Sequence, residues 1–178
     1  LREFLSDPRV VDLPGLPRWL LLNFFILPFR PRRSSKAYQK IWTESGSPLL
    51  SHSQAFKEAL ADSLPSNYVL ALGMRYGNPS IAGAVNELKS AGCQKFIVLP
   101  LFPQYSSAAT GSALQKALAT ISSLTAIPNV VVKREFYREA NFIEASAAHV
   151  LPYLKEAEPD LLVFSYHGLP ERQLKKSV

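Results

Sequence analysis

The sequence predicts an α/β fold in the form of a doubly wound, Rossmann-like parallel sheet of four strands with helices on both faces. Two observations support this prediction. Apolar runs of strand length alternate with longer segments whose apolar residues recur at helical spacing. The runs are also apolar at nearly every position, as in strands that are covered on both faces. This alternation is typical of parallel strands joined by crossover helices.

The first 64 residues are predicted to form helices and loops. The opening helix ends at Asp7, because a residue that precedes proline is steered away from helical angles. Pro28 closes the most apolar helix, and a serine caps the helix that begins at Ser34. The expected helices lie at 1–5, 18–27, 34–43 and 49–64.

After Pro65 the apolar pattern changes to short continuous runs that alternate with helical segments. Asn78 and Pro79 are predicted to start the first of these helices, as a cap followed by proline in the first turn, and Gly92 is predicted to end it. Pro152 is expected to kink or fray the last helix. The predicted strands lie at 68–74, 96–102, 129–132 and 161–166, and the helices between them at 79–91, 107–124 and 140–155.

Composition narrows the class of protein. The length of 178 residues suits one domain with a sizeable core. The net charge of +6 comes from scattered basic residues without a nucleic-acid-binding motif, so no nucleic-acid partner is expected. The single cysteine, Cys93, excludes an internal disulfide and fits a reducing compartment, which favours a cytoplasmic location. The one local concentration of positive charge contains Arg30, Arg32 and Arg33, for which a solvated basic loop is the alternative interpretation.

His167 follows the last predicted strand directly, and Gly168 and Pro170 end that strand. Open α/β sheets hold their ligands at the carboxyl ends of the strands. The unperturbed pKa of histidine, about 6.5, leaves a neutral nitrogen available near pH 7. His167 is therefore a candidate metal ligand or proton acceptor; the alternative is a histidine that only hydrogen-bonds the turn.

Two other strand ends carry unusual side chains: Arg75 and Tyr76 after one strand, and residues 103–106 after the next. Strand ends of one parallel sheet converge, so these side chains and His167 are expected to share a crevice. Aromatic walls with few polar groups suit a large, flat, apolar ligand. The segment 73–77 has only two glycines, so a dinucleotide-binding loop is not favoured.

Four segments of the chain resemble the ferrochelatase family, bacterial type, in the family's order. They are Gly-Met-Arg-Tyr at 73–76, Leu-Pro-Leu-Phe-Pro-Gln-Tyr-Ser at 99–106, Thr-Gly-Ser at 110–112 and Phe-Ser-Tyr-His-Gly-Leu-Pro at 164–170. The resemblance implies insertion of Fe(II) into protoporphyrin IX or a related porphyrin in the last steps of haem biosynthesis. It covers the amino-terminal half of a ferrochelatase. Residues 1–157 would form the first chelatase domain without its first strand, and residues 158–178 would begin the second.

The resemblance also implies a set of site residues. His167 would be the catalytic residue and the ligand of Fe²⁺, with a partner glutamate expected in the missing carboxyl-terminal half. Arginine matches the geometry of porphyrin carboxylates. The implied porphyrin-binding residues are Arg30, Arg32, Arg33, Arg75, Tyr76, Phe102, Tyr105 and Ser106. Iron would be a substrate, and no permanently bound cofactor is expected, since Ser107 occupies the position of an iron–sulfur cluster cysteine in animal members.

Two other functions, and a contact of the chain with a membrane, are alternatives that the sequence leaves open. A cobalt or sirohydrochlorin chelatase of similar fold would share a strand-end histidine, and a porphyrin or haem carrier would bind without catalysis. The apolar segment 18–29 is too short to span a membrane, which takes about 20 residues. Its alternatives are core packing and peripheral contact with the inner membrane through an interfacial helix.

Overall fold

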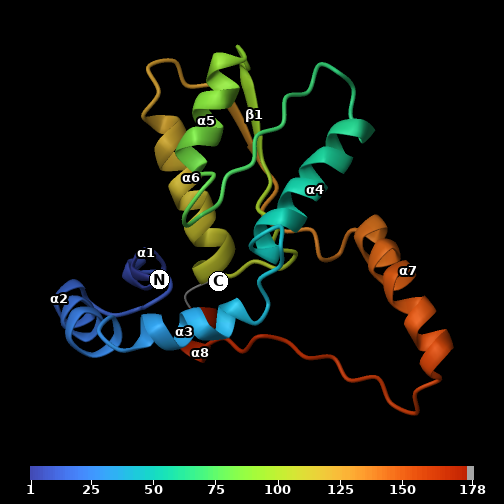
Figure 1. Cartoon of the computed structure of the whole chain (residues 1–178). Coiled ribbons are helices and arrows are strands. Elements are labelled where there is room, and N and C mark those ends of the chain that lie inside the picture. Colours follow the sequence, from blue (N-terminus) through green and yellow to red (C-terminus); the bar gives the residue numbers. More distant parts are fainter. Residues whose placement is uncertain (176–178) are drawn as a thin grey trace.

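The computed structural model describes residues 1–175, apart from the side chains of Arg33 and Lys175. Its centre is a parallel pair of strands, β1 (Lys95–Val98) and β2 (Asn129–Val132), in the register Lys95↔Asn129 to Val98↔Val132. Figure 1 shows α5 (Ile81–Ser90) and α6 (Ser112–Ser122) together on one side of these strands, and α4 (Pro48–Ser63) on the other. The predicted mixed fold with a parallel sheet is confirmed.

The core lies between the sheet and the two helices beside it. Val85 of α5, Phe96 of β1 and Ile121 of α6 are almost fully buried against one another. Each such side chain contributes about 1.5 to 3 kcal/mol when it is removed from water. The core is completed by partly buried apolar residues: Ile81, Leu88, Cys93, Val98, Leu124 and Val130.

The chain enters α5 by a route that differs from the prediction. The helix begins at Ile81 and not at Asn78 and Pro79, with Ser80 as its cap: the Ser80 hydroxyl accepts from the amide of Gly83 at 3.0 Å. The carbonyl of Pro79 instead accepts the Met74 amide at 2.7 Å. This bond brings Met74 beside Ser80 as an isolated parallel bridge, so residues 75–79 form a tight loop at the end of the extended segment.

Gly73 permits this close approach. A Cβ atom at Gly73 would lie 2.9 Å from the Cα atom of Ile81, closer than real Cβ contacts. Because the neighbouring atom belongs to the backbone, a side chain could be accommodated only if the extended segment moved away from α5. The absence of a side chain at Gly73 therefore allows the loop that carries Arg75 and Tyr76 to lie against the first turn of α5.

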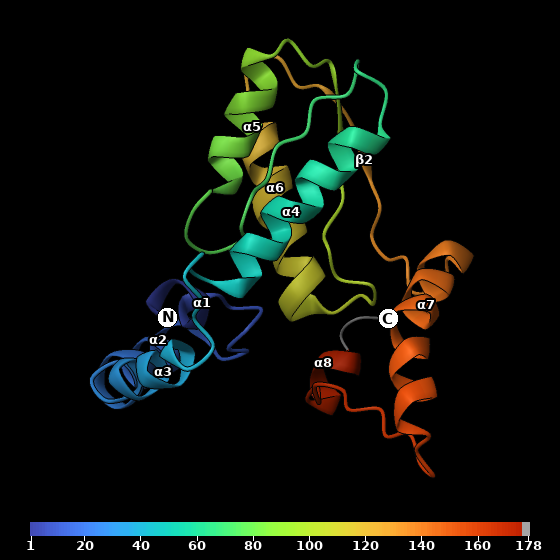
Figure 2. The same ribbon diagram turned by 45° about the vertical axis from the view of Figure 1, so that its right-hand side comes forward.

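Only two of the four predicted strands form ladders among the described residues. The segment 68–74 is irregular apart from the Met74 bridge, and 161–166 is an outstretched chain between α7 (Ala140–Ala157) and α8 (Glu171–Lys175) (Figure 2). Phe164 in the latter segment is 71% exposed. The four-stranded sheet is thus not confirmed. An apolar run records a tendency to be buried, but a strand also needs a neighbour that satisfies its backbone hydrogen bonds.

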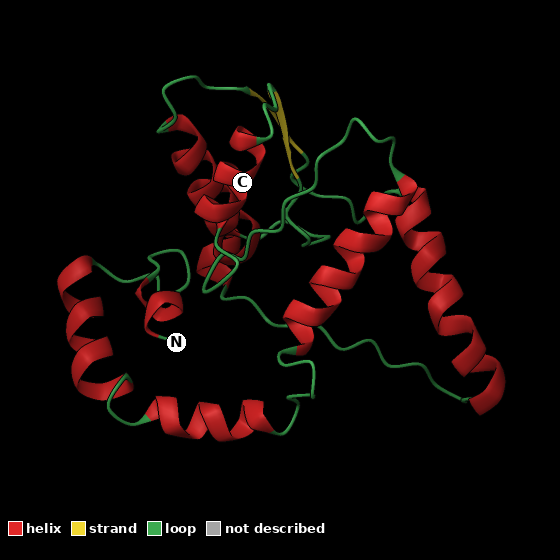
Figure 3. Cartoon of the chain, turned by 45° about the horizontal axis from the view of Figure 1, so that its top comes forward, coloured by secondary structure: helices red, strands yellow, loops and turns green. Residues whose placement is uncertain are grey.

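The amino-terminal region is helical, as predicted, but its boundaries differ. It contains α1 (Arg2–Ser6), α2 (Gly15–Leu20), a π-helical continuation η1 (Leu21–Ile26) and α3 (Arg30–Gln39) (Figure 3). The predicted helix at 34–43 starts four residues earlier. The three arginines therefore lie in the first turn of α3 and not in a loop.

The apolar helix formed by α2 and η1 is mostly exposed: Leu22 is buried, whereas Phe24 and Phe25 project outward. Across the described residues, no helix is both long and apolar enough to cross a membrane. The long helix α7 runs through Pro152 to Ala157 without ending there, and α8 is an element that the sequence did not predict.

Candidate functional site

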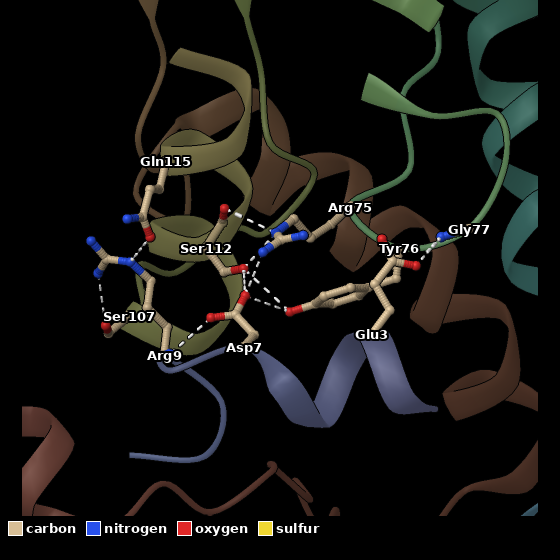
Figure 4. A network of polar contacts seen from close by, with 9 residues as sticks. All are labelled: Glu3, Asp7, Arg9, Arg75, Tyr76, Gly77, Ser107, Ser112 and Gln115. Carbon is tan, nitrogen blue, oxygen red and sulfur yellow. Dashed lines mark hydrogen bonds and ion pairs between the residues drawn. The ribbon is translucent and has the colours of Figure 1, made fainter. Parts of the chain in front are cut away.

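The site is organised around the carboxylate of Asp7, a residue that is only 5% exposed. Its Oδ2 atom accepts hydrogen bonds from Arg75 Nη2 at 2.6 Å, from the Tyr76 hydroxyl at 2.9 Å and from the Ser112 hydroxyl. Its Oδ1 atom accepts the backbone amide of Arg9 at 2.8 Å. Figure 4 shows these donors converging on one carboxylate from three separate parts of the chain. We call Asp7, Arg75, Tyr76 and Ser112 the Asp7 network.

Arg75 and Ser112 are linked a second time. Arg75 Nε donates to the Ser112 hydroxyl at 2.6 Å and to the Ser112 carbonyl at 3.1 Å. The guanidinium carbon lies 4.5 Å from the centre of the Tyr76 ring, within range of a cation–π contact. Ser112 is fully buried, and no buried side-chain polar atom in the described part of the chain lacks a hydrogen-bond partner. The network is therefore fully satisfied, as a buried polar cluster must be to avoid a desolvation penalty.

The network changes the acidity of two groups. Burial acts to raise the pKa of Asp7, but hydrogen bonds from Ser112, the Arg9 amide and Tyr76, together with the charge of Arg75, hold that pKa below its ordinary value of 3.8. Burial raises the pKa of Tyr76 above 10.0, against the Ser112 hydrogen bond and with the help of the Asp7 charge. At neutral pH Asp7 is thus a carboxylate and Tyr76 a neutral phenol.

Local sequence explains how these residues meet. Pro8 ends α1, and Asp7 at the helix end has an extended backbone with ψ of 122°. Ser112 is the first residue of α6, directly after the π-helical turn η2 (Ser107–Gly111), whose cap is the Ser106 hydroxyl. Arg75 lies in the loop that Gly73 holds against α5. The network joins residues up to 105 positions apart.

A second group of contacts adjoins the network. Arg9 donates from Nε to the Gln115 side chain at 2.7 Å and from Nη1 to the Ser107 hydroxyl at 3.1 Å. A Cβ atom on Gly111 would lie 3.1 Å from both Arg9 Nη1 and the Tyr105 hydroxyl. Arg134 stacks on the Tyr105 ring at 3.8 Å from its centre. The loop after Asp7 therefore also contacts the segment that follows β1.

Several predicted site residues belong to this region. Arg75 and Tyr76 lie in the Asp7 network, Tyr105 lies beside Gly111, and Ser106 caps η2. Phe102, in the same post-β1 segment, is exposed. Arg75 contacts Ser112 at the start of α6, and the convergence of the first two predicted strand ends in one crevice stays a prediction.

The other predicted residues lie elsewhere. His167 is exposed in the segment between α7 and α8. Arg30 and Arg32 are exposed in α3, and the side chain of Arg33 is outside the described residues. An ion pair between Arg172 of α8 and Asp12, at 3.6 Å, connects the end of the His167 segment to the same loop that carries Asp7.

Sequence reasoning missed Asp7, Arg9, Asp12 and the role of Ser112. Asp7 was interpreted only as the end of a helix. One signal was available: an arginine placed directly after a buried strand needs a carboxylate partner, because buried charges are paired. With 14 acidic residues in the chain, that argument does not say which one pairs with Arg75.

Within the described residues, the Asp7 network contains no metal-binding cluster and is separate from the hollow beside β1. Within residues 1–175, no three His, Cys, Asp or Glu side chains lie close enough together to hold a metal ion. A hollow of about 360 Å³ at the amino end of β1, between residues 92–96 and 124–128, shares no residue with the Asp7 network. The chemistry of the site therefore rests on a carboxylate, a guanidinium, a phenol and a hydroxyl.

Comparison with known proteins identifies the family. A sequence model described as ferrochelatase matches residues 1–178. A ferrochelatase of Legionella pneumophila (strain Paris) is 52% identical over 177 residues, which are 99% of this chain and 52% of that protein. A ferrochelatase of Coxiella burnetii (strain Dugway 5J108-111) is 48% identical over 177 residues, 99% of this chain and 49% of that protein. The chain spans about half the length of these curated relatives, and it belongs to the ferrochelatase family.

Proposed function

We propose that the protein containing this chain is a lyase that inserts Fe(II) into protoporphyrin IX, or a related porphyrin, in the terminal steps of haem biosynthesis. The observation that carries the proposal is the identity of about half of all positions with proteins named ferrochelatase, over 99% of the chain. Iron and the porphyrin are the substrates, and no resident cofactor is invoked.

Metal insertion makes two demands on a protein. Two pyrrole N–H protons must leave while Fe(II) loses its own ligands, and a planar macrocycle hides its nitrogen lone pairs from both events. A protein helps by holding the ring in a bent form and by placing a base or ligand beside the inner nitrogens. A neutral imidazole accepts protons and is a suitable ligand for Fe(II). We assign this role to His167, as the proton acceptor or as the ligand that delivers iron.

The proposal requires His167 to come to the sheet. We propose that in the whole protein the segments 68–74 and 161–166 join β1 and β2 in a four-stranded parallel sheet, and that 158–178, which contains the last of these strands, leads into the second domain. Support comes from the exposed apolar side chains of 161–166, which have a strong hydrophobic tendency to be covered. In that arrangement His167 would stand at a strand's carboxyl end, beside the segments that carry Arg75 and Tyr105.

The remaining residues are assigned to the porphyrin. Phe102, Tyr105 and Ser106 are proposed as walls of the pocket together with Arg75 and Tyr76. Arg30, Arg32 and Arg33 are proposed to bind the porphyrin carboxylates. The exposure of Arg30 and Arg32 supports this role, because their guanidinium groups are accessible to an incoming anion.

We also propose a peripheral contact with the cytoplasmic face of the inner membrane. Trp19, Phe24, Phe25 and Phe29 are exposed on the α2–η1 helix and the turn after it, directly before the basic first turn of α3. Exposed aromatic side chains next to arginines are typical of helices that lie in the interface of an anionic bilayer.

The test is metal insertion by the purified whole protein. The protein should convert protoporphyrin and Fe(II), under anaerobic conditions, to haem, and Zn(II) to zinc porphyrin. Replacing His167 by Ala should lower the insertion rate by about 10²- to 10⁴-fold, the usual contribution of a general base, with the melting temperature and porphyrin fluorescence quenching unchanged. His52→Ala, an exposed histidine of α4, is the matched control and should retain the parental rate.

Two results would contradict the proposal. Porphyrin binding without insertion by the parent protein would indicate a carrier. Insertion at the parental rate by a folded His167→Ala variant would remove His167 from the mechanism.

A further inference from the structure

The loop 7–12 contacts the segment that carries Arg75 and Tyr76, the first residue of α6 and the helix α8 that follows the His167 segment. Asp7 binds Arg75, Tyr76 and Ser112, and Asp12 pairs with Arg172, two positions after the His167-Gly-Leu-Pro sequence ends at Pro170. Glu3 adds a fourth link, accepting the amide of Gly77 at 3.2 Å. A single short loop thus holds segments that are far apart in the sequence.

Asp7 restricts the orientation of the Arg75 guanidinium and balances its charge. The guanidinium donates through Nε to Ser112 and through Nη2 to Asp7, so two of its three nitrogens are occupied and its charge is balanced at 2.6 Å. The same carboxylate fixes the Tyr76 hydroxyl at 2.9 Å, while Phe4 packs edge-on against the Tyr76 ring with ring centres 5.2 Å apart. Arg75 and Tyr76 are therefore held in one arrangement by contacts to both the ring and the charged groups.

We propose that Asp7 is a positioning residue of the metal-insertion site, which acts through Arg75 and Tyr76 by fixing their orientation and cancelling the guanidinium charge. This inference rests on the proposed function. Asp7 does not itself touch the porphyrin in this proposal. It keeps two pocket residues rigid, so that the macrocycle meets a preformed wall and Arg75 does not compete with the α3 arginines for the porphyrin carboxylates.

Geometry favours positioning over simple packing as the role of Asp7. A buried ion pair is often no more stabilising than apolar residues of the same volume, so stability alone does not explain one. What the carboxylate adds is direction: three donors converge on a single oxygen, and the other oxygen is anchored by the Arg9 amide. Asparagine cannot reproduce this, because it has one acceptor oxygen, no charge, and an NH₂ group that would face a donor.

The test is a double-mutant cycle in the whole protein, with kcat and the KM for porphyrin measured separately. Asp7→Asn should lower kcat by about 10- to 100-fold, the cost of a small misplacement of site groups. In an Arg75→Gln background, Asp7→Asn should cause a smaller loss than in the parent, because the part of its effect that acts through Arg75 is already absent and only the Tyr76 contact remains to be lost. Asp62→Asn is the matched control: it neutralises an exposed carboxylate of α4 that is not part of the Asp7 network, and it should retain the parental kcat.

A separate control shows whether each variant is folded. All variants are assayed at a temperature at which their circular dichroism equals that of the parent. Ser112→Ala removes the hydroxyl that bridges Asp7 and Arg75 and takes the place of Asp7→Asn if that variant does not fold. It should lower kcat by at least about threefold in the parent, the loss expected from about 0.6 kcal/mol of one hydrogen bond, and by a smaller factor in the Arg75→Gln background.

The outcomes separate the two proposals. An active parent with an Asp7→Asn variant of parental kcat overturns the positioning role, and so does an equal loss in both backgrounds, which indicates a purely structural residue. A parent that inserts no metal contradicts the proposed function instead.

Discussion

The segment 161–167 is distinctive in sequence but exposed in the structure, whereas the Asp7 network is inconspicuous in sequence but largely buried and fully hydrogen-bonded in the structure. The segment contains the most specific motif of the chain, yet its apolar side chains are exposed and it forms no ladder among the described residues. Asp7 was predicted from the sequence only to end a helix, yet it is buried and binds four donors. The difference lies in partners: Asp7 has all of its partners within residues 1–112, whereas a strand needs a neighbouring strand.

This contrast separates two kinds of information. A motif records which chemistry a segment carries, and that information is local. Burial depends on which other segments are present to cover a surface and to satisfy backbone groups. The Asp7 network shows that long-range order can be produced by a few polar side chains, even where the sheet between the same segments is incomplete.

The largest expected effect is on the free energy of unfolding, and it should differ between the two regions. Asp7→Asn should lower the free energy of unfolding of the 178-residue chain by about 3 kcal/mol, near the lower end for breaking a buried ion pair, because Arg75 keeps 22% side-chain exposure. Phe164→Ala should change it by less than about 0.5 kcal/mol, as for other exposed positions. Urea unfolding at pH 7 measures both values.

The Phe164→Ala variant also tests strand pairing in the whole protein. If residues 161–166 form a covered strand there, Phe164→Ala should cost about 3 to 5 kcal/mol. A cost below about 0.5 kcal/mol in the whole protein as well would contradict the proposed pairing.

A second comparison uses two glycines. Gly73→Ala should destabilise the chain by about 1 to 3 kcal/mol, the usual cost of overpacking, because the added Cβ would lie 2.9 Å from the Ile81 backbone. Gly168→Ala should be neutral, since nothing lies within 4 Å of its Cβ position and its φ is not positive. Thermal unfolding of the two variants measures the difference, and equal melting temperatures would argue against close packing at Gly73.

The sequence predicted the parts of the fold that depend on local pattern. The helical periodicity of α5, with Ile81, Val85 and Leu88 on one face, placed the core correctly, and the short apolar runs located β1 and β2. The start of α5 was predicted wrongly because the Pro79 carbonyl is bound by Met74, a contact between segments that no local rule contains.

The candidate site could be predicted only in part, for the same reason. Arg75 and Tyr76 were found because they follow an apolar run. Asp7 was not, since its role depends on a pairing across 68 residues with one of 14 acidic side chains. Ser112 belonged to a recognised segment, but its complete burial against Asp7 is a property of the folded chain.

A third prediction concerns the exposed basic turn of α3. Replacing Arg30, Arg32 and Arg33 by Ala in the whole protein should weaken binding of free-acid porphyrin more than binding of its esterified form. Charge-assisted contacts contribute about 1.5 to 3 kcal/mol each when partly desolvated, but exposed ones less than about 1 kcal/mol, so a several-fold loss is expected. Fluorescence titration with both porphyrins measures it, with Arg138→Ala/Lys155→Ala as a control near α7. Equal losses for the two ligands would exclude carboxylate binding.

The smallest expected effect is the acid dependence of stability. The pKa of folded Asp7 lies below the 3.8 of the unfolded chain, with burial opposing the hydrogen bonds and the Arg75 charge that lower it. A lowered pKa means that the folded state binds the proton less tightly than the unfolded state does. The contribution of Asp7 to stability is therefore fully present above about pH 4, and is lost as the pH falls through the folded pKa. Because burial cancels part of the shift, this loss should be small.

Urea unfolding between pH 7 and pH 3 distinguishes this contribution from general acid denaturation. Asp7→Asn should flatten the acid limb relative to the parent, since the variant has no carboxylate to protonate at that position. Asp160→Asn changes the net charge equally, but in the exposed segment next to 161–167, and should leave the acid limb as steep as in the parent. If both variants flattened it alike, net charge would be the cause, and the stability of the Asp7 network would not depend on ionisation of its carboxylate.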